Sequence, residues 1–152
     1  MTPKLRPLVL TSEEGPTVEM GPLEQIMFKA TGPATGGAFD LLEVTRQPGG
    51  GPPEHVHHRN DEAYYLIEGS CQVKFGNDVF AVTPGSFIFV PRGTPHTFGN
   101  TSAKPARMLV MVTPDFLAVD PLRHRGGPAE PRLGRASGRD AGDPRRRAEP
   151  RR

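Results

Sequence analysis

Glycine and proline interrupt this chain often and divide it into short segments. The sequence has 18 glycines and 18 prolines in 152 residues, and its apolar segments are only three to six residues long. Up to residue 112 no ten-residue window keeps the 3.6-residue helical period, whereas the segments are rich in β-branched and aromatic side chains. Many short strands joined by tight turns predict an all-β sandwich or barrel. The segments that we predict as strands are 7–10, 25–29, 39–44, 63–68, 71–75, 79–82, 86–90, 96–98 and 107–112.

The last thirty residues differ sharply from the rest. Residues 123–152 contain ten arginines and four carboxylates, a net charge of +6, so residues 1–122 carry −4 of the chain's total of +2. With Leu133 as its one large aliphatic residue, the segment has too little apolar surface to offset the entropy of ordering. We predict a single domain over 1–122, closed by a short helix near 114–122, and a disordered basic tail over 123–152.

Charge and composition also bear on location and partners. An arginine-rich tail could touch nucleic acid or an anionic membrane, but without aromatic residues or periodicity a solvated extension is the favoured interpretation. No amphipathic helical pair predicts a helix-turn-helix, so nucleic acid is not an expected partner. Cys71 is the one cysteine, which excludes an intrachain disulfide. No apolar run reaches the length of a signal peptide or membrane span, so we expect a cytoplasmic protein with no membrane partner.

Three of the five histidines fall within four positions, in the stretch PPEHVHHRNDE. On a strand, His55 and His57 would share one face and His58 would take the other, because side chains alternate. Two imidazoles on one face can bind one metal ion. Glu62 follows a polar run that could turn the chain and return a carboxylate to the same centre. We expect His58 to be solvated.

A further ligand would have to come from elsewhere in the chain. Of the two remaining histidines, His124 lies in the basic tail, whereas His96 follows the loop PRGTP between two predicted strands and is the natural candidate. Taken alone, each histidine is more often a hydrogen-bonded core side chain than a ligand, and Glu62 alone would be an ordinary surface carboxylate. Only their joint spacing favours a metal site.

Ten positions spanning 49–100 follow two spaced motifs, separated by the fifteen residues 70–84. The first runs G-x5-H-x-H-x4-E-x6-G and the second G-x5-P-x-G-x2-H-x3-N; the fixed positions are Gly49, His55, His57, Glu62, Gly69, Gly85, Pro91, Gly93, His96 and Asn100. This pattern closely resembles the two motifs of the cupin superfamily. The resemblance implies a double-stranded β-helix, a jelly-roll barrel, with 49–100 as its motif core. It also implies that His55, His57, Glu62 and His96 are metal ligands.

Three imidazoles and one carboxylate suit a single divalent transition metal: Fe, Mn, Ni, Co, Cu or Zn. Glu62 has a second potential role as a general base that accepts a proton from a substrate hydroxyl. The alternation of side chains places Tyr64 and Leu66 on the same face as Glu62, and Phe98 on the same face as His96. We therefore predict that these three side chains line the pocket or fill the core.

Within the superfamily the stretch PPEHVHHRNDEAYYLIEG most resembles the quercetinase-like small cupins. This resemblance implies a metal-dependent dioxygenase that joins O2 to a small enolic or phenolic, flavonol-like compound. Two alternatives stay open: a metal-dependent isomerase, epimerase or lyase, and a non-catalytic cupin that binds a metal or small molecule. The resemblance also implies a homodimer, for which residues 7–10 and the outward row Ala63, Tyr65 and Ile67 are suited.

Overall fold

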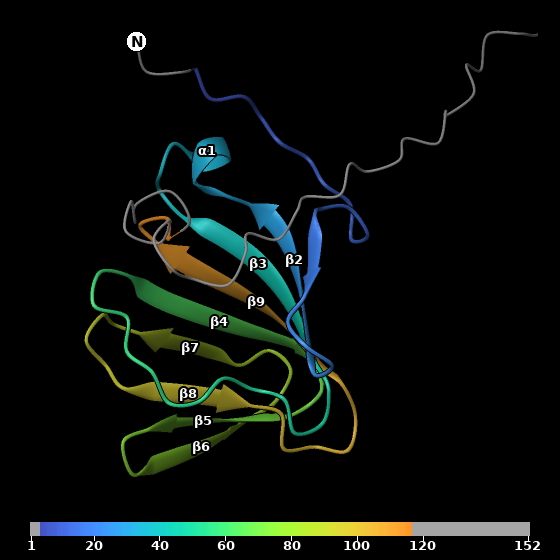
Figure 1. Ribbon diagram of the computed structural model, residues 1–152, viewed down its shortest axis with the longest axis vertical. Helices are drawn as coiled ribbons and strands as arrows, with labels where there is room; N and C mark the ends of the chain where they lie inside the picture. The colour runs from blue at the N-terminus through green and yellow to red at the C-terminus, as the bar shows by residue number, and fades with distance from the viewer. Residues whose placement is uncertain (1–3, 117–152) are drawn as a thin grey trace, which may run out of the picture.

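The computed structural model describes residues 4–116, and its regular structure is almost entirely strand (Figure 1). One short helix, α1 (Gly32–Thr35), lies between the second and third strands. The strands, in chain order, are β1 (Thr17–Glu19), β2 (Glu24–Ala30), β3 (Asp40–Arg46), β4 (Asp61–Glu68), β5 (Cys71–Phe75), β6 (Asp78–Val82), β7 (Phe87–Val90), β8 (His96–Gly99) and β9 (Ala106–Thr113).

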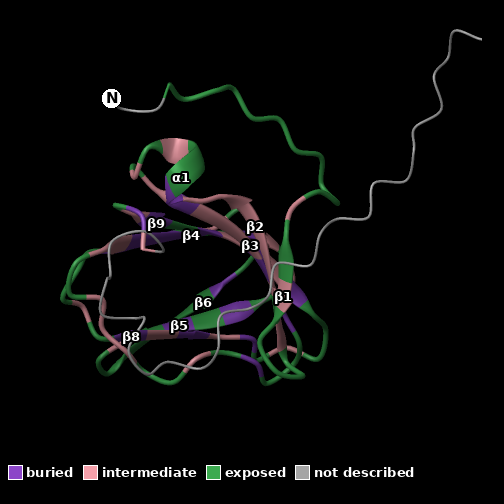
Figure 2. Cartoon of the chain, turned by 45° about the horizontal axis from the view of Figure 1, so that its top comes forward, coloured by how far each residue is buried: buried purple, intermediate pink, exposed green. Residues whose placement is uncertain are grey.

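These strands form two antiparallel sheets that face each other (Figure 2). The larger sheet has the order β1-β2-β3-β9-β4-β7, and the smaller has the order β6-β5-β8. The prediction of an all-β, double-sheet barrel is confirmed. Strand β4, which carries Glu62, pairs with β9 on one side and with β7 on the other, so it is not an edge strand of the larger sheet.

The core lies between the two sheets and follows from the alternation of side chains. Along β9, buried and less buried residues alternate over the whole strand. Both sheets contribute to the core, whose largest fully buried apolar side chains are Phe98, Leu66, Met108 and Val73. The predicted inward placement of Tyr64, Leu66 and Phe98 is therefore confirmed.

The turn between β4 and β5 shows why one motif position is glycine. Gly69 has a φ of 86°, in the left-handed region that favours glycine. A Cβ at Gly69 would lie 2.7 Å from the Cα of Ala106, at the start of β9. Any larger side chain would therefore push the turn away from the strand that pairs with β4.

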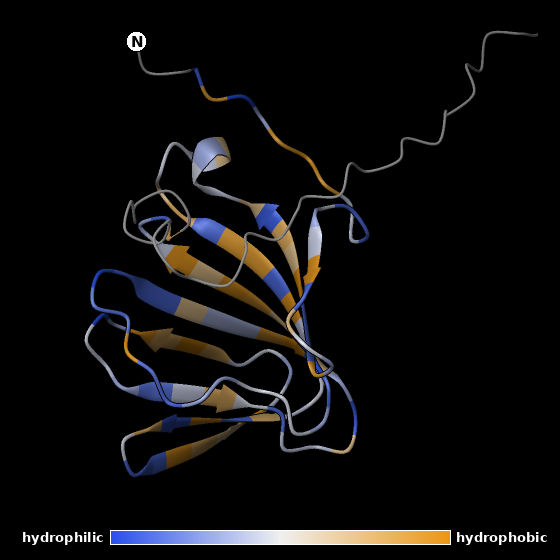
Figure 3. Ribbon diagram, viewed as in Figure 1, coloured by the Kyte–Doolittle hydropathy of each residue, from blue (hydrophilic) through white to orange (hydrophobic). Residues whose placement is uncertain are grey.

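The N-terminal prediction was wrong in one respect. Residues 7–10 form no strand; they are extended and exposed, and appear as an apolar stretch outside the barrel in Figure 3. A strand needs a partner for its backbone groups, and none of the described residues pairs with this segment. β1 and α1 were not predicted. The eight other predicted segments overlap β2 to β9.

Two predictions concern the other end of the chain. The predicted helix near 114–122 falls largely outside the described residues, and residues 114–116 are not helical. The predicted disordered tail, 123–152, lies wholly outside them. Among the described residues, no helix has the length and apolar character that a membrane crossing needs.

Candidate metal centre

Four side chains from three separate segments converge between the sheets. His55 and His57 lie in the connection between β3 and β4, Glu62 is the second residue of β4, and His96 is the first of β8. One potential ligand atom from each lies within 4.8 Å of every other. Glu62 and His96 are buried, whereas His55 and His57 are partly exposed. The structure thus brings together the four residues that the sequence predicts as ligands.

The backbone places His55 directly opposite His96. The two residues form an isolated antiparallel bridge, with both N–H···O distances at 3.0 Å. In Figure 1 the teal connection from β3 to β4 passes alongside β8. The histidine stretch forms no strand of its own; its pairing with β8 is this isolated bridge. The rings of His55 and His57 nevertheless lie 4.9 Å apart, edge to face, and His58 is exposed, as predicted.

Two of the imidazoles are oriented by carbonyl groups in their own segments. Nδ1 of His55 lies 2.9 Å from the carbonyl oxygen of Pro53, and Nδ1 of His96 lies 2.9 Å from that of Thr94. A carbonyl oxygen only accepts a hydrogen bond, so each Nδ1 carries the proton and donates it. In the neutral rings the lone pair is then on Nε2, the nitrogen left for a metal ion.

Glu62 is the electrostatic centre of the group. Its Oε2 lies 3.0 Å from Nε2 of His96 and 3.2 Å from Nε2 of His57. Burial alone would raise the pKa of Glu62, but its polar contacts with His57, His96 and Tyr64 outweigh burial and lower the pKa to about 2. Burial alone would lower the pKa of His96, but the hydrogen bonds to Glu62 and Thr94 raise it. The carboxylate is therefore ionised at neutral pH.

The donor set fits a divalent transition metal. Nε2 of His57 is buried and has no hydrogen bond of acceptable geometry, although Glu62 lies nearby. Because Nδ1 of His96 already donates its proton, the short contact between its Nε2 and Glu62 needs a positive charge, which a second proton or a metal ion can supply. Three imidazole nitrogens and a carboxylate oxygen are a ligand set that such metals favour. Metal binding by these four residues stays a prediction.

A layer of aromatic and charged side chains supports the glutamate. The Tyr64 hydroxyl lies 3.4 Å from Nε2 of His96, and its proximity helps to lower the pKa of Glu62. Burial and the charge of Glu62 raise the pKa of Tyr64, so the hydroxyl keeps its proton and can donate it. The Tyr64 ring stacks on Phe98 with centroids 4.8 Å apart, and the Arg46 guanidinium lies 5.6 Å from the Phe98 centroid. These contacts fix the ring that holds the carboxylate.

Phe116 is a residue near the centre that the sequence analysis missed. Its ring lies 6.2 Å from that of His57, edge to face. Its backbone N–H donates to Oδ2 of the buried Asp40 at 2.7 Å, and Asn60 donates to the carbonyl of Pro114 at 2.6 Å. The pairing of Thr113 with the first residue of β4 brings the end of β9 beside Glu62. Without that pairing, nothing in the local sequence indicates the role of Phe116.

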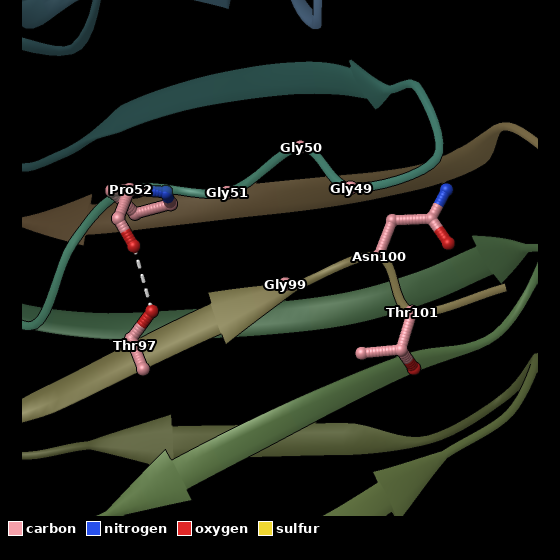
Figure 4. A pocket seen from close by; sticks show the side chains of 8 residues that line it. All are labelled: Gly49, Gly50, Gly51, Pro52, Thr97, Gly99, Asn100 and Thr101. Carbon is pink, nitrogen blue, oxygen red and sulfur yellow. Dashed lines mark hydrogen bonds between the residues drawn. The ribbon is translucent and has the colours of Figure 1, made fainter.

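A separate hollow lies on the other side of β8. It has a volume of about 330 Å³ and is lined by Gly49, Gly50, Gly51, Pro52, Thr97, Gly99, Asn100 and Thr101 (Figure 4). Thr97 and Gly99 alternate along β8 with the buried His96 and Phe98, so the hollow and the four-residue centre use opposite faces of the strand. A hydrogen bond of 2.7 Å from Thr97 to the carbonyl of Pro52 closes one side of it.

Comparison with known proteins agrees with this geometry. Residues 42–112 match the family described as the cupin domain. The match and the double-sheet barrel give this segment the fold of a cupin domain. It extends from β3 to β9 and includes all four residues of the centre.

Two curated relatives are similar to this chain in sequence, and one solved structure is similar to it in fold. TcmJ, a tetracenomycin polyketide synthase protein of Streptomyces glaucescens, is 33% identical over 81 residues, which cover 53% of each chain. Quercetin 2,3-dioxygenase of Bacillus subtilis is 26% identical over 92 residues, which cover 60% of this chain and 27% of that protein. The chain thus spans about half or less of these relatives. A predicted oxalate decarboxylase from Thermotoga maritima superposes with a TM-score of 0.65 at 18% identity, over 70% of this chain and 98% of that one, which shows the fold alone.

Proposed function

We propose that this protein is a metal-dependent cupin oxidoreductase of the dioxygenase type, acting on a small enolic or phenolic compound. The observation that carries the proposal is the state of Glu62: a buried carboxylate, ionised at neutral pH, among three imidazoles. Such a group can both bind a metal ion and accept a proton from a substrate that binds beside it.

The residues that would hold the metal are His55, His57, Glu62 and His96. When bound there, a divalent transition metal supplies Lewis acidity and the ability to react with dioxygen. The carbonyls of Pro53 and Thr94 keep Nε2 of His55 and His96 available by accepting their Nδ1 protons.

Proton transfer is the task that the chain itself can perform. An enolic or phenolic hydroxyl that enters the site can donate a hydrogen bond to a carboxylate oxygen of Glu62. Because the pKa of Glu62 is near 2, it is a weak base, and it would take the proton only from a hydroxyl that a bound metal ion has acidified. The deprotonated substrate is electron-rich and reactive toward dioxygen. Tyr64 has its pKa raised and remains a hydrogen-bond donor, so it orients Glu62 rather than competing for the proton. The Phe116 ring beside His57 offers an apolar wall for a flat substrate.

The names of two relatives support this substrate class. One is a quercetin 2,3-dioxygenase and the other a polyketide synthase protein. A flavonol carries an enolic hydroxyl beside a ketone, and polyketide chains carry β-dicarbonyl units that enolise. Both classes therefore present the acidic hydroxyl that Glu62 would deprotonate.

Dioxygen uptake tests the proposal. The protein is loaded separately with Fe²⁺, Mn²⁺, Ni²⁺, Co²⁺, Cu²⁺ and Zn²⁺ and mixed with quercetin, a 1,3-diketone and a catechol, while dissolved O2 and the substrate spectrum are followed. We expect uptake that depends on metal and substrate, and its loss in Glu62→Gln. The matched control is Glu54→Gln, which changes an exposed carboxylate of the same connection.

The outcomes separate the three classes of function. Turnover of a compound without O2 uptake would replace the proposal by an isomerase, epimerase or lyase. Metal binding with no turnover of any of these compounds would contradict the proposal and favour a binding cupin.

A further inference from the structure

The loop between β7 and β8 contacts both histidine-bearing segments of the metal centre. The N–H of Gly93 donates to the carbonyl of His57 at 2.8 Å. The carbonyl of Thr94 accepts from Nδ1 of His96 at 2.9 Å. His96 in turn pairs with His55 through two backbone hydrogen bonds. A displacement of this loop would therefore move three of the four potential ligands.

Arg92 connects the same loop to β4, the strand that carries Glu62, the fourth potential ligand. Its backbone N–H and its Nε donate to Oδ1 of Asp61 at 2.9 and 3.0 Å, and its Nη2 donates to Oδ2 at 2.9 Å. Asp61 directly precedes Glu62. Arg92 is exposed and Asp61 is partly exposed, so an ordinary ion pair here would add little stability. A planar guanidinium with two bonds to one carboxylate, and a third bond from the backbone, fixes direction as well as distance.

We propose that Arg92 and Asp61 are positioning residues of the metal centre, holding the 91–95 loop against β4 so that the imidazoles and Glu62 meet at one point. The inference rests on the proposed function only to the extent that the four residues bind a metal ion. Neither residue is one of the four ligands. They act through His57, His96 and Glu62.

The loss of a charge and the loss of ligand positioning predict opposite effects of Arg92→Ala on metal affinity. Arg92→Ala removes a positive charge near a bound dication, and by Coulomb's law alone the change would strengthen metal binding. If Arg92 positions the ligands, the same change weakens metal binding. Asp61→Ala loses all three hydrogen bonds, whereas Arg92→Ala keeps the one from the backbone N–H. The positioning role therefore predicts the larger loss for Asp61→Ala.

The experiment measures Co²⁺ affinity by titration of the visible absorption of the full chain, with the unfolding temperature of the metal-free protein recorded in parallel. Loss of a group that orients metal ligands costs about 10- to 100-fold in metal affinity, so we expect about 10-fold weaker binding for Arg92→Ala and more for Asp61→Ala. The double variant should be no weaker than Asp61→Ala, because the two residues act as one unit. The Co²⁺ band should also shift, since it reports the arrangement of the ligands.

Arg107→Ala is the matched control. Arg107 is a partly exposed arginine that pairs with Glu43 at 3.2 Å and Glu68 at 3.7 Å, and it bonds to no residue of the centre. We expect Co²⁺ affinity and absorption like those of the unaltered protein. If Arg92→Ala fails to fold, Arg92→Lys keeps the test, because a lysine cannot form the two-pronged contact and should weaken Co²⁺ binding about threefold or more.

Unchanged or tighter Co²⁺ binding by Arg92→Ala, with an unshifted band, would overturn the inference. So would an equal loss in Arg107→Ala, or a protein that binds no Co²⁺ at all. Co²⁺ binding that follows the expected order while no substrate consumes O2 would contradict the dioxygenase proposal and leave the positioning role standing.

Discussion

Strand β4 has two faces, and the same strand serves two purposes. Glu62, Tyr64 and Leu66 point inward and are 7%, 2% and 0% exposed. On the outward face, Tyr65 is 46% exposed and has Phe87 opposite it on β7. The inner face surrounds a carboxylate with apolar and aromatic side chains, and the outer face presents aromatic side chains to solvent.

The outward residues form a continuous group across three strands. Ala63 of β4 pairs with Phe89 of β7 and with Met111 of β9, and Phe87 and Phe89 are 67% and 55% exposed. We call these residues the outer aromatic patch: the aromatic residues Tyr65, Phe87 and Phe89, together with the adjoining Met111. The comparison teaches that apolar character does not by itself identify the inside of a sheet: here one face is covered by the opposite sheet and the other is not.

The largest expected effect is the loss of metal affinity when a potential ligand of the metal centre is removed. His96→Ala removes a buried potential ligand and the partner of Glu62, and we expect metal affinity to fall by more than the 10- to 100-fold typical of residues that only support ligands, about 1,000-fold. Metal content by mass spectrometry and titration with Co²⁺ measure the loss. His58→Ala, in the exposed neighbour, is the control; equal metal content in the two variants would contradict the assigned site.

The next largest effect should be on the free energy of unfolding, which we expect to differ between substitutions on the inner and outer faces of the larger sheet. Leu66 is fully buried, so Leu66→Ala should cost about 2–5 kcal/mol of unfolding free energy through lost burial and a residual cavity. Phe89→Ala on the outer face should cost about 0.5 kcal/mol or less in the monomer. Urea unfolding at low protein concentration measures both. Similar costs would mean that the outer face is packed in the monomer.

The outer aromatic patch leads to a proposal about assembly. We propose that two copies of the chain form a homodimer through it, because exposed apolar side chains that adjoin one another favour association. Light scattering should give twice the chain mass of 16.5 kDa, and Phe87→Asp should return the single mass by placing a charge in the contact. A monomeric mass for the unaltered protein would end the proposal.

The smallest effect concerns Asp61, at the start of the outward row. Side-chain and backbone hydrogen bonds from Arg92 lower the pKa of Asp61 to about 2. Because the folded pKa lies below the unfolded value of about 3.9, the pair contributes stability above pH 4 and loses it as the pH falls toward 2. The difference in unfolding free energy between the unaltered protein and Asp61→Asn should therefore shrink between pH 4 and pH 2. A constant difference over that range would show that the pair does not stabilise the fold.

The sequence predicted the parts of this molecule that depend on local patterns. The spacing of the two motifs predicted all four residues of the centre, and alternation placed Tyr64 and Leu66 inside. The position of Phe116 depends on β9 pairing with β4, a contact between distant segments that no local pattern specifies. The exposure of Phe87 and Phe89 likewise depends on which face meets the second sheet. Residues 7–10 have the composition of a strand but no partner among the described residues.

The hydrogen bonds from His55 to Pro53 and from His96 to Thr94 have a consequence for ion selection. Each carbonyl is only two residues from its imidazole, so both rings are held before any ion arrives and lose little rotational entropy when it binds. These two rings cannot readily turn to suit the ion. Metals that accept the preset angles should exchange with one another, and occupancy would then follow their supply in the cell.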